Sequence, residues 1–111
     1  MIDNDTLLRL FRYKAWANDQ LLKALERLGE DSPVTPLAIQ ALSHTYVVDR
    51  IFAAHAQGQA HAYRSANLGE MPSLADLSAD LRRSDQEYIG YVSTLGPERL
   101  ATSIAFAFTD R

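Results

Sequence analysis

Hydrophobic residues recur at helical spacing along the first part of the chain. Two apolar stripes run through residues 5–28, so this segment is predicted to form one long amphipathic helix. Asp5 and Thr6 can accept hydrogen bonds from its first turn, and Gly29 can adopt the left-handed conformation that ends a helix. The stripes consist of Phe11, Ala15, Asn18, Leu22 and Leu25, and of Leu10, Tyr13, Ala17, Leu21 and Leu28.

A second helix is predicted over residues 36–57. Thr35 can cap its start, and Pro36 is tolerated at a first helical position because the N–H that proline lacks would be unpaired there anyway. Gly58 is the expected stop. The segment is apolar around much of its circumference, which indicates burial on more than one side.

Residues 58–72 show no period and are expected to form a long connection. Ser73 and Asp76 then have the spacing of a capping box, and a third helix is predicted over residues 73–95. In residues 104–108, large and small apolar residues alternate with period two, which favours a short strand or extended segment.

These elements predict an all-α fold in a single domain over residues 1–111. The short first connection makes the first two helices antiparallel neighbours, whereas the long second connection can set the third helix parallel to the second. Three helices with wide apolar faces leave one flank of the core open. The pattern therefore fits a four-helix bundle of which helices one to three and an extended C-terminal segment are present, and we expect something to cover the open flank.

Composition narrows the possible functions. The chain has 111 residues, 47% hydrophobic content, a net charge of −3 and no cysteine, which suits one core without disulfides and excludes thiolate metal sites and a cysteine nucleophile. No run approaches the roughly 18 apolar residues that span a bilayer, and the acidic N-terminus is unlike a signal peptide, so a cytoplasmic protein without membrane contact is expected. Its basic residues are not gathered into a patch, which argues against nucleic-acid binding.

The strongest candidate metal ligands are the three histidines. His44 and His55 lie on nearly the same side of the second predicted helix but about 16 Å apart along its axis, too far to share one ion. His61 could fold back toward His55, although nothing in the spacing directs it there. The chain alone presents no complete metal-ligand set, no phosphate-binding loop and no recognisable nucleophile.

Each polar residue on an apolar stripe also has a structural interpretation. His44 follows Leu37 and Ala41 on one line of the helix and could be a core histidine with one satisfied nitrogen. For His55, a hydrogen bond or an interaction with the helix C-terminus is expected. The remaining expectations are packing for Tyr13 and Trp16, a buried amide for Asn18, and exposure or an interhelical pair for Asp49 and Arg50.

Two motifs taken together resemble a known family. Residues 11–18 read FRYKAWAN, and residues 42–44 read LSH before VDRIFAAH in residues 48–55. This combination resembles the DinB/YfiT-like superfamily of four-helix-bundle metalloenzymes over essentially the whole chain. Residues 106–110 correspond to the stretch that precedes the fourth helix in that family.

The resemblance implies a metal site centred on His44. In the family, a histidine at this position joins an H-x-x-x-H pair at the start of helix four to bind a divalent metal, with zinc or nickel expected here. The chain reaches Arg111 without such a pair, and His55 and His61 do not replace it, so the site is incomplete in this chain. Either the sequence is part of a longer polypeptide, which we favour, or a second copy covers the open core.

The resemblance also implies a reaction class. A completed site could lower the pKa of bound water or hold a thiol as thiolate, as in thiol-dependent S-transferases and isomerases acting on small molecules. The alternative is a non-catalytic helical-bundle homodimer or binding protein with His44 as a structural core residue. The metal hypothesis requires the His44 ring to face donors from outside this stretch, and a ring turned to solvent or packed among leucines would count against it.

Overall fold

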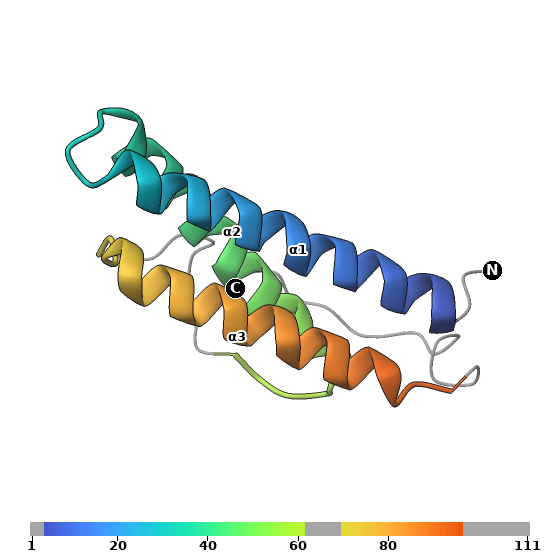
Figure 1. Ribbon diagram of the computed structural model, residues 1–111. Helices are drawn as coiled ribbons and strands as arrows, with labels where there is room; N and C mark the ends of the chain where they lie inside the picture. The colour runs from blue at the N-terminus through green and yellow to red at the C-terminus, as the bar shows by residue number, and fades with distance from the viewer. Residues whose placement is uncertain (1–3, 62–69, 97–111) are drawn as a thin grey trace.

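The computed structural model describes residues 4–61 and 70–96, which form three helices and, within these ranges, no strand (Figure 1). The helices are α1 (Asn4–Leu28), α2 (Val34–Ala56) and α3 (Leu74–Ser93). The prediction of an all-α fold is confirmed, and the predicted helix ends differ from the observed ones by at most two residues. The predicted extended segment at 104–108 lies outside the described residues.

The predicted helix boundaries have the expected chemistry at Gly29, Gly58 and Ser73, but not at Thr35. The Ser73 hydroxyl accepts a hydrogen bond from the Asp76 N–H at 3.1 Å, and Gly29 ends α1 with a positive φ of 82°. The prediction that Thr35 caps α2 is wrong, because Pro33 occupies the N-cap without a side-chain bond. The Thr35 hydroxyl is buried in the first turn and donates to the Gly29 carbonyl at 2.7 Å, which satisfies an acceptor at the end of α1 instead.

α1 runs antiparallel to both other helices, and α2 and α3 run in the same direction (Figure 1). Residue numbers rise together along α2 and α3: Arg50 pairs with Glu87 at 2.7 Å, and the Ala56 carbonyl accepts from the Tyr91 hydroxyl at 2.9 Å. The predicted orientation of the helices is therefore confirmed. The connection between α2 and α3 is long enough to return the chain to the start of the bundle.

A leucine cluster between the three helices forms the core at the end of the bundle where α3 begins. It contains two leucines of the first stripe of α1, one leucine of α2 and three leucines of α3. The first stripe of α1 therefore packs inward, as predicted. The buried members are Leu22, Leu25, Leu42, Leu74, Leu77 and Leu81.

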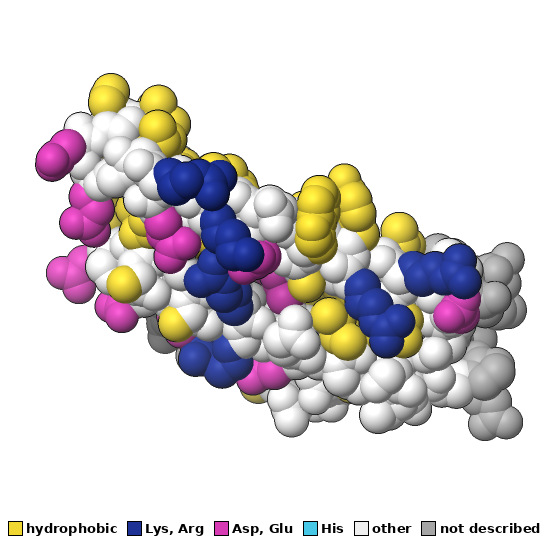
Figure 2. Space-filling view, viewed as in Figure 1, with side chains coloured by type: hydrophobic (Ala, Val, Ile, Leu, Met, Phe, Trp, Pro, Cys, Tyr) yellow, Lys and Arg dark blue, Asp and Glu magenta, His cyan; other side chains and the backbone are white. Residues whose placement is uncertain are grey.

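The second stripe of α1 and one side of α2 are not covered by the described residues. α3 packs against both helices, whereas α1 and α2 contact each other at few positions. Large apolar side chains consequently remain exposed, and Figure 2 shows hydrophobic side chains along the upper edge of the molecule over α1. We call these residues the α1–α2 apolar face: Leu10, Tyr13, Leu21, Leu28, Leu37 and Phe52.

No helix in residues 4–61 and 70–96 is long and apolar enough to cross a bilayer.

Candidate functional site

Charged and polar side chains from all three helices meet in a cluster at mid-bundle. Lys14 of α1 donates hydrogen bonds to Asp49 of α2 at 2.6 Å and to Asp85 of α3 at 2.8 Å. Asn18 donates to the second oxygen of Asp85 at 2.9 Å, as expected for an amide on the buried stripe. Asp85 is only 4% exposed, so its charge is buried and depends on these two donors.

Tyr88 completes this polar cluster, which we define as Lys14, Asn18, Asp49, Asp85 and Tyr88. The Tyr88 hydroxyl donates to the Asp49 backbone carbonyl, and its ring stacks on Phe11 with centroids 4.9 Å apart. The Lys14 ammonium lies 6.0 Å from the centroid of the same ring. The tyrosine thus packs against the lysine that joins the two carboxylates.

The sequence left Asp49 either exposed or paired across helices, of which the structure shows the pair, but Lys14 and Asp85 were missed. A signal was present: Asp85 stands four residues after buried Leu81, on the line of α3 that faces the core. A carboxylate on a buried line needs a cation or several N–H donors near it. The helical period therefore shows that Asp85 needs a partner, but it does not show which residue is that partner.

Burial and ion pairing act against each other in the cluster. Burial raises the pKa of Asp49, and the Lys14 ammonium offsets only part of that rise. Burial alone would lower the pKa of Lys14, but its hydrogen bonds to Asp49 and Asp85 outweigh this effect and raise it. Burial, together with the Asp49 charge, also raises the pKa of Tyr88. Every member is engaged by another, so the cluster is suited to fixing the three helices relative to one another.

These shifts predict that the protein loses stability at alkaline pH. Because folding raises the pKa of Lys14 above its ordinary 10.5, its contribution is complete below 10.5 and disappears as pH rises through the folded-state value. Urea unfolding measured from about pH 9 to about pH 12 should show the free energy of unfolding falling at the upper end. In Lys14→Met this fall should be shallower, and an equal fall in both proteins would contradict the assignment.

His44 does not join the core or the polar cluster. Its side chain is exposed on the side of α2 that α3 leaves uncovered, so the interpretation as a core histidine is wrong for the described part of the chain. The physical reason is that α2 is apolar all around, but α3 packs against one side of it only.

The structure does bring the other two histidines together. The rings of His55 and His61 meet edge to face with centroids 5.4 Å apart, a proximity that the sequence spacing alone could not establish. Within residues 4–61 and 70–96, no group of three histidine or carboxylate side chains is placed to hold a metal ion. The described residues therefore do not form a metal site by themselves.

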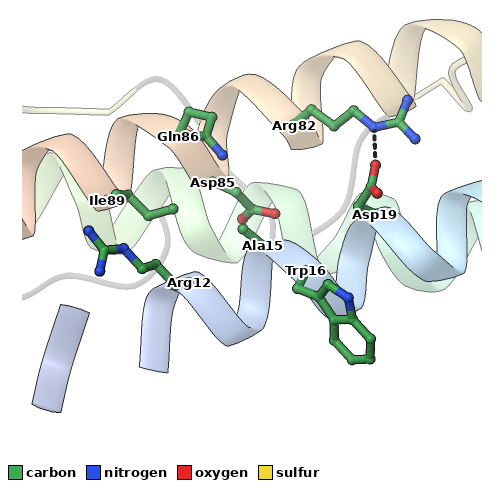
Figure 3. A pocket seen from close by; sticks show the side chains of 8 residues that line it. All are labelled: Arg12, Ala15, Trp16, Asp19, Arg82, Asp85, Gln86 and Ile89. Carbon is green, nitrogen blue, oxygen red and sulfur yellow. Dashed lines mark hydrogen bonds and ion pairs between the residues drawn. The ribbon is translucent and has the colours of Figure 1, made fainter. Parts of the chain in front are cut away.

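A groove of about 650 Å³ lies between α1 and α3, next to the polar cluster (Figure 3). The Arg82 guanidinium closes one part of it by pairing with Asp19 at 3.0 Å. Trp16, which was predicted to pack inside the bundle, is 58% exposed along this groove, and Tyr13 beside it is exposed as well. The lining residues are Arg12, Ala15, Trp16, Asp19, Arg82, Asp85, Gln86 and Ile89.

No protein-family description, curated protein or solved structure matches this chain. The resemblance to DinB/YfiT-like bundles therefore rests on the motifs in residues 11–18 and 42–55 alone.

Proposed function

We propose that this chain forms three helices of a DinB/YfiT-like bundle in which a further helix covers the α1–α2 apolar face. In the completed bundle, His44 is one ligand of a divalent metal, and the protein is an enzyme acting on a small molecule, of the thiol-dependent S-transferase or isomerase type. His44 is exposed on the side of α2 that the described residues leave uncovered, and a ring open to solvent counts against a metal site formed by these residues alone. The observation that carries the proposal is therefore the α1–α2 apolar face beside His44, which a further helix carrying nitrogen donors would cover.

The surroundings of His44 favour a covering helix. Leu37 and Phe52 stand about two turns before and after it on the same helix, and both are exposed; Leu37 is 68% exposed. Burying one such side chain stabilises a protein by about 1.5–3 kcal/mol, so a helix laid over several of them gains substantially. Such a helix would also exclude water from the imidazole and could carry additional nitrogen ligands to it.

The described residues supply one ligand, and zinc or nickel would need at least two more from the covering helix. When bound, the metal would supply Lewis acidity, which lowers the pKa of water or of a thiol. The contribution of this chain is to hold the His44 imidazole on α2, which packs against α3.

A second candidate is a non-catalytic homodimer or binding protein in which a second copy covers the same face. It is favoured by the exposed α1–α2 apolar face, which needs a partner whether or not a metal is present.

Metal content and oligomeric state, measured together, test both candidates. After incubation with zinc or nickel and dialysis, a polypeptide that includes the covering helix should keep about one equivalent of metal, and His44→Ala in that polypeptide should lose it. His55→Ala is the matched control, a histidine on the same helix, and should keep the metal.

Protein that stays metal-free, or that loses no metal on His44→Ala, would contradict the enzyme proposal. A metal-free dimer that Leu37→Glu converts to a monomer would support the second candidate instead. If the protein is a monomer, and Leu37→Glu changes neither its stability nor its metal content, both candidates are contradicted.

A further inference from the structure

The groove between α1 and α3 has features of a small-molecule site. Its volume of about 650 Å³ falls within the roughly 300–1,000 Å³ that is typical of ligand pockets. The groove borders the α1–α2 apolar face, because the ring of its lining residue Trp16 meets the ring of Tyr13 with centroids 5.8 Å apart, but its α3 wall of Arg82, Asp85, Gln86 and Ile89 lies outside that face.

The charges that line the groove favour an anion. Asp19 is neutralised by Lys23 at 3.1 Å and by Arg82 at 3.0 Å, and Asp85 is neutralised by Lys14. Arg12 is the one charged lining residue without a hydrogen bond or ion pair to the described parts of the chain. A cation entering the groove would meet carboxylates that are already paired, whereas a carboxylate would find a free guanidinium.

The apolar lining favours a flat ligand body. The indole of Trp16 is more than half exposed, and Ala15 and Ile89 add aliphatic surface. In Figure 3 the Arg12 side chain lies beside Ile89 at one end of the groove, the Arg82–Asp19 pair lies at the other end, and the Trp16 indole extends from α1 on the side away from α3, so that a ligand contacting both Arg12 and Trp16 lies along α1. An aromatic ring can contact the indole while its acidic group reaches Arg12, one helical turn away.

We propose that this groove binds a small aromatic carboxylate, with Arg12 pairing with the carboxylate and Trp16 contacting the ring. The planar guanidinium fork of arginine matches a carboxylate through two parallel hydrogen bonds. Arg82, held by Asp19, forms the far wall of the site.

Trp16 is the only tryptophan in the chain, so its fluorescence reports directly on the groove. Titration with benzoate in the presence of EDTA should give a saturable change. Benzamide, which has nearly the same shape but no charge, should bind at least about tenfold more weakly, because it cannot form the charged pair with Arg12.

The matched variants are Arg12→Gln and Arg9→Gln. Both residues are exposed on α1, but Arg9 pairs with Asp5 at 3.0 Å and does not line the groove. Arg12→Gln should weaken benzoate binding at least about tenfold, and Arg9→Gln should leave it unchanged.

Three results would overturn the inference: a fluorescence change that stays linear to about 10 mM benzoate, equal affinities for benzoate and benzamide, or equal affinities of the two arginine variants. EDTA removes any metal from the assay, so failure of the groove proposal and failure of the His44 proposal are distinguishable.

Discussion

Replacing Lys14 by methionine is expected to lower the free energy of unfolding by about 3 kcal/mol. Methionine keeps most of the apolar stem but removes the ammonium that joins Asp49 and Asp85. Asp85 would then be a buried carboxylate with the Asn18 amide as its remaining donor in the cluster. Removal of one partner of a buried pair is costly because the remaining charge keeps its desolvation penalty. Urea unfolding at neutral pH measures the loss.

Two further variants distinguish the effect of breaking the buried pair from the effect of removing any positive charge. Lys23→Met removes an exposed lysine from the same helix, where it pairs with Asp19 at 3.1 Å, and no measurable change is expected. In an Asp85→Asn background, Lys14→Met should cost clearly less than in the native protein, since no buried charge is stranded. If Lys14→Met proves no more harmful than Lys23→Met, the polar cluster does not hold the helices together.

The helices and their ends could be predicted because they depend on residues close together in the sequence. The inward stripe of α1 follows from a 3.6-residue period that Leu22 and Leu25 obey, and the cap of α3 requires only that Ser73 stands three residues before Asp76. Asn18 was correctly placed on the buried side for the same reason. Local chemistry of this kind needs no knowledge of which helix packs against which.

The polar cluster depends on contacts between distant residues and could not be predicted as a whole. Lys14 is separated from Asp49 by 35 positions and from Asp85 by 71. Helical periodicity states which side of a helix each residue occupies, but the choice of partner follows from the axial register of three helices. That register is set by the packing of the entire core, which a single sequence does not display.

The exposure of His44, Tyr13 and Trp16 has a different cause. An apolar stripe in a sequence indicates that some surface is to be covered, but it does not say whether the cover comes from the same chain. The two stripes of α1 look alike in the sequence, yet one packs in the leucine core and the large side chains of the other remain about half exposed in the described ranges. The proposal that His44 binds a metal likewise depends on what covers the α1–α2 apolar face.

Neighbouring leucines on α1 allow the two kinds of apolar surface to be compared directly. Leu22 is 0% exposed in the leucine core, whereas Leu21 is 44% exposed on the α1–α2 apolar face. Leu22→Ala is expected to lower the free energy of unfolding by about 3 kcal/mol, since it removes buried methyl groups and leaves a cavity. Thermal or urea unfolding at one protein concentration measures this effect.

Leu21→Ala, by contrast, should behave according to what covers the face. Without a partner, the substitution should cost clearly less than Leu22→Ala, and equally at every protein concentration, because nearly half of the Leu21 side chain is already in water. With a second copy on the face, the loss should appear as a lower unfolding midpoint at high protein concentration and fade on dilution. A helix of the same polypeptide would give a loss that dilution does not change. The dependence of the Leu21→Ala effect on concentration therefore identifies the partner of the surface on which His44 stands.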